Sequence, residues 1–273
     1  MQAFPAWMPP GGTLGQIISE TRDRVDELRS RRRDLENAAA KQPRALPFAA
    51  ALRRADVAVI AELKRRSPSR GEINGGLSAR DQAASYAKGG AAAISVLTEP
   101  RHFGGSAEDL ETARAAGGLP VLKKDFHVDA LQLLEARALG ASAVLLIARA
   151  LEPRHLARLA TDAHALELEV LVEVRSEPEL DLALSTGATA VGVNARDLET
   201  LEMDFALAGR LLPAIPSDRV AIAESGVRSP DDVRRAAACG ADAVLVGSIL
   251  SASSEPADGV RALTGISRLQ RGG

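Results

Sequence analysis

Short apolar runs alternate with amphipathic segments from about residue 57 to the end of the chain. The runs are rich in Val, Ala, Ile and Leu and nearly continuous in apolarity, which is typical of parallel strands covered on both faces. The predicted strands are AVIAELK (58–64), AAISVLTE (92–99), PVLKKDF (120–126), SAVLLIA (142–148), EVLVEV (169–174), TAVGVNA (189–195), RVAIAES (219–225) and DAVLVGS (242–248). A segment of helical periodicity follows each run, so the pattern predicts eight βα units.

A repeated sequence supports this division. GGAAAISV, GASAVLLI, GATAVGVN and GADAVLVG each join a predicted helix end to an apolar run, with a glycine where a helix C-cap needs a left-handed residue. Eight units in about 220 residues match a (β/α)₈ barrel. An open doubly wound sheet is the alternative, but no G-x-G-x-x-G opens a helix. We predict an α/β fold, a single (β/α)₈ TIM barrel with an N-terminal helical extension.

The N-terminal part of the chain has a different pattern. An apolar stripe at helical spacing predicts an amphipathic helix over 13–35, either continuous or bent or interrupted before Pro43. The stripe is formed by Leu14, Ile17, Ile18, Val25, Leu28 and Leu35. Arginines at 29 and 31–33 are interleaved with acidic residues, which favours a solvated face over a nucleic-acid patch. We expect residues 1–47 to form a segment whose helix packs on the barrel and helps cover its mouth, and residues 48–273 to form the barrel.

Composition narrows the class of protein. The 273 residues carry a net charge of −2, so no global electrostatic footprint for nucleic acid is present. The single cysteine, Cys239, excludes an internal disulfide. No apolar run approaches the roughly 18–20 residues of a membrane span, and the N-terminus lacks the pattern of a secretory signal. We therefore expect a cytoplasmic protein with no nucleic-acid or membrane partner.

Charged and amide side chains recur at the carboxyl ends of the predicted strands, where (β/α)₈ barrels form their active sites. They are Glu62, Lys64, Lys124, Glu173, Asn194 and Glu224. A single one is explained equally well by a structural ion pair, but several at one barrel mouth favour a site suited to acid–base chemistry. The four histidines (His102, His127, His155 and His164) are scattered and show no metal-ligand spacing. We expect His127, although near the mouth, to lie on a loop surface.

Glycine and serine follow the seventh and eighth predicted strands, where barrels of this type bind phosphate. The candidates are Gly226, Gly247 and Ser248, and Ser67 from the loop after the first strand adds a hydroxyl. Each Gly-Ser pair alone is typical of an ordinary turn. Their placement on the two expected strands favours a phosphate site.

Motifs along nearly the whole chain resemble those of one family, in the family's order. They are IAELKRRSPSRG (60–71), SVLTEPRHFGGS (95–106), VLKKDF (121–126), GASAVLLIA (140–148), VLVEV (170–174), VGVNARDL (191–198), AIAESGV (221–227) and VLVGSIL (244–250). The chain resembles indole-3-glycerol phosphate synthase, a tryptophan-pathway barrel enzyme with an N-terminal helical extension. Two residues depart from the common pattern: Ala195 where many members carry a second asparagine, and Lys123 where arginine is frequent.

The resemblance implies a decarboxylating, ring-closing carbon–carbon lyase without metal or organic cofactor. Its substrate would be 1-(2-carboxyphenylamino)-1-deoxyribulose 5-phosphate, and its products indole-3-glycerol phosphate, CO₂ and water. By similarity Lys124 would be the general acid for ring closure. Glu173 and Lys64 would carry out the dehydration, with Glu62 orienting Lys64, and which of the two acts as the acid stays open.

The resemblance also implies binding roles. Asn194 and Arg196 would hold the substrate's carboxylate and hydroxyl groups, with Glu224 and Ser225 nearby, and Ser67, Gly226, Gly247 and Ser248 would bind phosphate. The aryl ring needs an apolar slot, for which the candidates are Phe103, Phe126, Leu145 and Leu198. Core packing explains the two leucines equally well. We expect a monomer, and the sequence leaves open whether it contacts other tryptophan-pathway enzymes.

Two other functions compete with this interpretation. Another phosphate-binding barrel, such as phosphoribosylanthranilate isomerase, would explain the Gly-Ser loops but not Glu62, Lys64, Lys124 and Glu173 together. A non-catalytic barrel that senses a sugar phosphate would be expected to lose the charged groups while keeping the phosphate loops. Both sets are intact here, which favours the enzyme.

Overall fold

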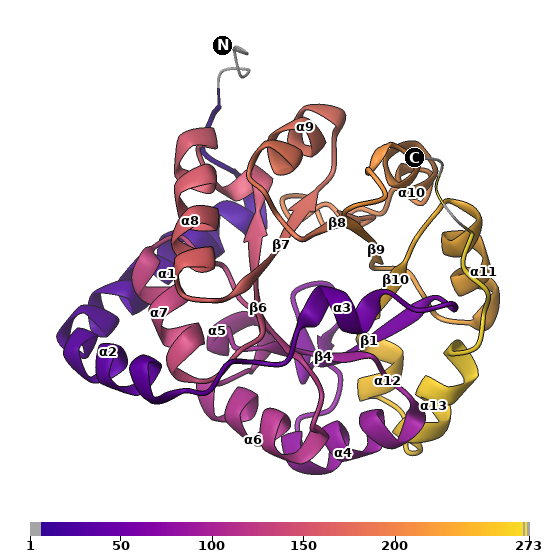
Figure 1. The fold of residues 1–273 in the computed structure, drawn as a ribbon, viewed down its shortest axis with the longest axis horizontal. Helices are drawn as coiled ribbons and strands as arrows, with labels where there is room; N and C mark the ends of the chain where they lie inside the picture. Colours follow the sequence, from indigo (N-terminus) through magenta and orange to yellow (C-terminus); the bar gives the residue numbers. More distant parts are fainter. Residues whose placement is uncertain (1–6, 270, 272–273) are drawn as a thin grey trace.

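Eight parallel strands close into a barrel in the computed structural model, which describes residues 7–269 and 271 (Figure 1). The strands are β1 (Ala58–Leu63), β4 (Ala93–Leu97), β5 (Val121–Lys124), β6 (Ala143–Ile147), β7 (Glu169–Val174), β8 (Ala190–Asn194), β9 (Val220–Glu224) and β10 (Ala243–Val246). Pairing of β10 with β1, from Ala58 opposite Ala243 to Ala61 opposite Val246, closes the circle. Strand side chains are buried on both faces, so the predicted fold class is confirmed.

Helices form the outer ring of the barrel (Figure 1). The longer ones are α4 (Ala79–Gly89), α6 (Ala107–Gly117), α7 (Ala130–Ala138), α8 (Pro153–Ala165), α9 (Glu177–Ser185), α11 (Pro230–Ala238) and α13 (Pro256–Leu263). Shorter turns are α3 (Phe48–Leu52), α5 (Pro100–Phe103), η1 (Ala148–Ala150), α10 (Leu207–Leu211), η2 (Leu212–Ala214) and α12 (Ser248–Ser251). The repeated glycines Gly90, Gly140, Gly187 and Gly240 all have positive φ, as the repeat predicted.

The N-terminal apolar stripe forms two helices, so the helix predicted from residue 13 onward is interrupted, and the interruption lies at Arg31. α1 (Gly12–Ser30) and α2 (Arg32–Lys41) meet at Arg31, whose backbone leaves the helical region. Because of this break, the apolar side chains of the stripe are buried at two separate places. Leu14, Ile17 and Ile18 join the main core, whereas Leu28 and Leu35 form a separate apolar cluster with α7. Figure 1 shows both helices outside the barrel beside α7.

A buried charge network ties α1 to the end of β5. The guanidinium of Arg24 donates to both carboxylate oxygens of Asp125, at 3.0 and 2.7 Å. Asp125 also accepts from the Thr98 hydroxyl (2.6 Å) and from the backbone N–H of Phe126 (2.8 Å). Burial opposes the charge of Asp125, but Lys123 and Arg24 hold the pKa of this carboxyl well below its usual range. The network fixes the backbone on either side of Lys124.

Among the helices of residues 7–269 and 271, none is long and apolar enough to cross a membrane.

Arg24→Met should lower the free energy of unfolding by about 2–4 kcal/mol, because it leaves the buried Asp125 carboxylate with one cation fewer. The lowered pKa of Asp125 contributes stability above the carboxyl's unfolded pKa, and this stability is lost as the pH falls towards the folded value. The difference between the two proteins should therefore shrink below about pH 4.

The measurement is chemical denaturation at pH 7 and at pH 3.5–4. Arg29→Met is the matched control on the same helix, since the Arg29 side chain is 66% exposed and its ion pair with Asp26 lies at the surface. Equal stability of the Arg24 and Arg29 variants at pH 7 would contradict this account of the network.

Candidate active site

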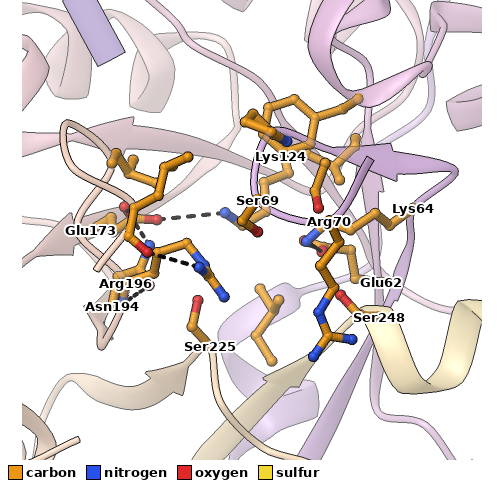
Figure 2. A pocket seen from close by; sticks show the side chains of 18 of the residues that line it. Glu62, Lys64, Ser69, Arg70, Lys124, Glu173, Asn194, Arg196, Ser225 and Ser248 are labelled. Atoms are coloured by element: carbon orange, nitrogen blue, oxygen red, sulfur yellow. Dashed lines mark hydrogen bonds and ion pairs between the residues drawn. The ribbon is translucent and has the colours of Figure 1, made fainter. Parts of the chain in front are cut away.

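A cavity opens at the carboxyl ends of the strands and is lined from all eight of them or from the loops that follow (Figure 2). The lining includes all but one of the residues predicted from the sequence: Glu62, Lys64, Ser67, Phe103, Lys124, Phe126, Leu145, Glu173, Asn194, Arg196, Leu198, Ser225, Gly226, Gly247 and Ser248. Glu224 is the exception, because it contacts Lys124 but does not line the cavity. Thr13 and Ile17 of α1 also reach the lining.

Two lysines and three carboxylates alternate through the base of this cavity. Lys64 Nζ lies 2.7 Å from Glu62 Oε1. Lys124 Nζ lies 3.5 Å from an oxygen of Glu173 and 3.5 Å from one of Glu224. The three carboxylate side chains are only 2% exposed. Burial of five charges together is costly unless each has a partner, so the cluster is held by mutual pairing.

Mutual pairing sets the protonation states of the cluster. Burial opposes the charge of Lys124, but the surrounding carboxylates, Glu224 foremost, outweigh it and raise the pKa of Lys124. Burial also opposes ionisation of Glu62, yet Lys64 and Lys124 lower the pKa of Glu62 overall. Glu224 differs, because burial and the neighbouring Glu173 and Glu62 raise the pKa of Glu224 to about 8 against the pull of Lys124. The site thus holds an ammonium donor beside carboxyl groups of different acidity.

Two glycines leave the space that the buried carboxylates occupy. A Cβ at Gly192 in β8 would lie 2.0 Å from Glu224 Oε1, and a Cβ at Gly247 would lie 2.4 Å from Glu62 Oε1. Neither position therefore admits a side chain without displacing a carboxylate. Gly192 also accounts for the alternation of β8, in which Asn194, two residues further along, points into the same barrel interior.

Asn194 links the carboxylate cluster to the loop after β8. Its side-chain amide donates to Glu173 Oε1 at 2.9 Å, and its Oδ1 accepts from the backbone N–H of Arg196 at 2.9 Å. From the loop that follows β7, the guanidinium of Arg175 donates to the backbone oxygen of Asn194 at 2.8 Å. The amide is thereby held in one orientation, with one oxygen of Glu173 engaged and the other facing Lys124. The departure at Ala195 leaves this arrangement intact.

Hydroxyl and backbone groups gather where the sequence predicted phosphate binding. Ser67 lies in β2 (Arg66–Ser67), which forms a small hairpin with β3 (Gly71–Glu72). Its hydroxyl is buried and has no hydrogen-bond partner within the described residues. Ser225, directly after β9, has a φ of 64°, a strained conformation for a residue other than glycine. Such strain and such an unmatched hydroxyl are typical of a binding site.

Sequence reasoning assigned only Arg196 among the arginines that reach the cavity. Arg70 from the β2–β3 hairpin and Arg228 from the loop after β9 also line it. Burial, together with the positive charges of Arg70 and Arg228, lowers the pKa of Arg196. Figure 2 shows the guanidinium of Arg70 extending along the cavity. Arg70 belongs to the SPSRG loop, so its place near the cavity could have been predicted from the sequence. No motif singles out Arg228.

An aromatic pair forms part of the wall. The ring centroids of Phe103 and Phe126 are 6.0 Å apart, and Lys64 Nζ lies 6.0 Å from the centroid of Phe103. Leu145 is buried and lines the cavity at the same time, so its core and lining roles coincide.

The expectation that His127 lies on a loop surface is wrong. Its side chain is buried, its Nδ1 lies 2.7 Å from the backbone oxygen of Leu145, and burial lowers the pKa of His127 to about 3. The loop after β5 turns inward because Asp125 and Phe126 are both anchored below it. Sequence spacing gave no sign of that anchorage.

The fold and the site together define a (β/α)₈-barrel enzyme with acid–base groups at the carboxyl ends of its strands. The family model of indole-3-glycerol phosphate synthase matches residues 14–263. Indole-3-glycerol phosphate synthase 2 of Streptomyces coelicolor is 46% identical over 256 residues, covering 93% of this chain and 99% of that protein. The indole-3-glycerol phosphate synthase of a Nocardioides species is 52% identical over 214 residues, covering 78% of this chain and 82% of that protein.

The chain belongs to the indole-3-glycerol phosphate synthase family. It is a tryptophan-biosynthesis enzyme that converts 1-(2-carboxyphenylamino)-1-deoxyribulose 5-phosphate to indole-3-glycerol phosphate, CO₂ and water. The likeness to one solved structure of low sequence identity shows the fold alone. Thiamine phosphate pyrophosphorylase from Pyrococcus furiosus is 16% identical with a TM-score of 0.57, over 78% of this chain and 95% of that one.

Glu224→Gln should stabilise the protein increasingly as the pH rises. The folded-state pKa of Glu224, about 8, lies above the ordinary value of 4.5, so the folded protein binds this proton more tightly. The stability that the bound proton contributes is full below the unfolded pKa and is lost as the pH rises through the folded pKa. The neutral glutamine avoids that loss, and the variant should gain on the order of 2 kcal/mol at pH 8 with little gain at pH 5.

Chemical denaturation at both pH values measures this gain, with the exposed Glu111→Gln on α6 as the control. A gain for Glu224→Gln that does not grow between pH 5 and pH 8 would show that Glu224 is ionised in the folded protein.

Proposed function

We propose that Lys124 is the general acid for ring closure, and one observation carries this assignment. Its ammonium group is buried in the cavity 3.5 Å from both Glu173 and Glu224, and those carboxylates raise its pKa. Lys124 therefore remains protonated at neutral pH. In this protonated form it donates to the ketone oxygen while the aryl carbon attacks the ketone carbon.

Loss of CO₂ and of water completes the reaction. The bond from the ring carbon to the carboxylate breaks, and its electron pair restores the aromatic ring. The new hydroxyl then needs a second proton to leave as water, and a proton is removed from the sugar-derived carbon beside the nitrogen. We assign the dehydration to Glu173 and Lys64, with Glu62 orienting Lys64 through its 2.7 Å ion pair.

Charge balance adds a requirement. The substrate enters with an ionised carboxylate and this group leaves as neutral CO₂, so two protons are donated and only one is returned. Each turnover therefore takes one proton from solvent. Lys124 and the dehydration pair must recover that proton before the next cycle.

The remaining residues are proposed to hold the substrate. Asn194 and Arg196 bind its carboxylate and hydroxyl groups, with Glu224 and Ser225 nearby, and the unmatched hydroxyl of Ser67 supports a phosphate ligand there. Gly226, Gly247 and Ser248 complete the phosphate site. Arg70 and Arg228 add positive charge to the cavity. The aryl ring lies in the apolar part of the wall, which is formed by Phe103, Phe126, Leu145 and Leu198.

We further propose that the enzyme acts in the cytoplasm as a monomer, on a phosphorylated small molecule and without nucleic-acid or membrane partners. Residues 1–47 form its N-terminal segment and 48–273 its catalytic barrel. The lining contributed by Thr13 and Ile17 supports a role for that segment at the mouth.

Lys124→Ala should reduce kcat on the order of 10²–10⁴-fold with a modest change in KM, because it removes a proton donor used mainly in the transition state. Turnover is measured by the fluorescence of the indole product. Lys88→Ala, an exposed lysine on α4, is the control for loss of a positive charge. Near-normal turnover of the Lys124 variant would contradict the assignment of Lys124 as the general acid.

Ser248→Asp should weaken the binding of substrate and of inorganic phosphate together, since a carboxylate placed in the phosphate site repels the anion. Titration calorimetry with phosphate measures this directly. Ser254→Asp places the same charge at an exposed position six residues further along. If both variants bind phosphate as the unmodified protein does, the phosphate site is placed wrongly.

A further inference from the structure

A second cavity lies behind Glu173. Its volume is about 280 Å³, and it shares Glu173, Ile147 and Leu198 with the first cavity. The rest of its lining comes from α1, from η1, from the start of α9 and from the loop after β8: Leu14, Arg149, Val174, Arg175, Ser176, Glu179, Asp197 and Glu199. Glu173 thus borders two cavities.

The second cavity connects solvent with Glu173. The side chains of Arg149, Glu199 and Asp197 are 32%, 26% and 31% exposed, whereas that of Glu173 is 2% exposed. The volume far exceeds the roughly 10–15 Å³ that one water needs, and several polar groups line it. A space of this size and polarity holds water. We call it the rear chamber.

The segment before α1 binds the rim of the rear chamber. The backbone N–H of Gly11 donates to Glu199 Oε1 at 2.5 Å, and that of Thr13 donates to the Glu199 backbone oxygen at 3.2 Å. Arg149 pairs with Glu199 at 3.0 Å and donates to the backbone oxygen of Met8 at 2.7 Å. These contacts define the chamber without filling it.

Glu179 is the carboxyl group of α9 that faces the chamber. One of its oxygens accepts from the backbone N–H of Arg175 at 2.7 Å. Burial raises the pKa of Glu179, the charge of Glu173 adds to the rise, and Arg149 and Arg175 oppose it. The other charged groups on the lining are Asp197 and Glu199. Glu179 therefore holds a proton more readily than an exposed glutamate.

The net proton that each cycle takes from solvent must reach the catalytic groups, and a substrate bound at the barrel mouth occupies the direct path to them. One proton enters from solvent in each cycle, and the substrate fills the mouth while the hydroxyl leaves. The cavity at the mouth is further covered by Thr13 and Ile17 of α1. A proton that reaches Glu173 through the rear chamber does not pass the bound substrate.

We propose that the rear chamber is the route by which Glu173 takes its proton from solvent, with Glu179 as the group that passes the proton on. The proton moves from a buffer acid or hydronium ion to the Glu179 carboxylate, and then through chamber water to the Glu173 carboxylate. No other bond forms or breaks. Glu179 acts through Glu173 and does not touch the substrate, so the inference rests on the proposed function and takes Glu173, rather than Lys64, as the acid of the dehydration.

The test is Glu179→Gln, which keeps an oxygen acceptor for the Arg175 N–H and the side-chain volume but removes the titrating group. We expect kcat to fall roughly 3–10-fold with KM within twofold of the unmodified value. The solvent deuterium isotope effect on kcat should increase, and added imidazole at constant pH should restore turnover. Glu179→Asp should retain most of the activity. Glu177→Gln, on the exposed side of the same helix turn, should behave as the unmodified protein does.

Normal kcat and a normal isotope effect in Glu179→Gln would overturn the route. So would a loss of turnover that neither imidazole nor aspartate relieves, because that loss would be structural. Glu173→Gln distinguishes a failure of the rear route from a failure of the proposed role of Glu173 in the dehydration. If it is inactive while Glu179→Gln is normal, only the rear route fails. If Glu173→Gln turns over normally, the role of Glu173 fails and the route with it.

Discussion

The ion pair of Lys124 with Glu173 is the interaction on which the rest of the site depends. Three carboxylates are buried at the base of the cavity, and the ammonium of Lys124 lies 3.5 Å from two of them. Without that charge the desolvation of Glu173 would be uncompensated. The same pairing helps to keep Lys124 protonated, so the stability of the cluster and the proposed proton donor of ring closure have one physical origin.

Holding this cluster in place requires structure around it. Asp125 follows Lys124 directly and is tied to α1 by the two bonds from Arg24, so the N-terminal helix supports the end of β5. Gly192 leaves the space that the carboxylate of Glu224 occupies. A buried arrangement of charges is tolerated only where every neighbour is matched to it in volume and in hydrogen bonding.

The position of Glu173 between two cavities relates the chemistry to the architecture. Ring closure and decarboxylation are assigned to the side of the barrel mouth, where Lys124 lies. Proton recovery is assigned to the rear chamber, which the end of β7 and the start of α9 border. Glu173 lines both cavities, whereas Val174, the next residue of β7, lines the rear chamber and not the cavity at the mouth.

The sequence by itself determined the barrel and the candidate residues at its mouth, because strand periodicity and helix ends are local properties. Strand alternation is compatible with Glu62, Lys64 and Glu173 pointing into the barrel, and all three line the cavity at its mouth. Only the tertiary structure decided how the N-terminal stripe divides at Arg31, that His127 is buried, and that Arg24 reaches Asp125. These features depend on packing between elements far apart in the chain, and a local pattern carries no record of such partners.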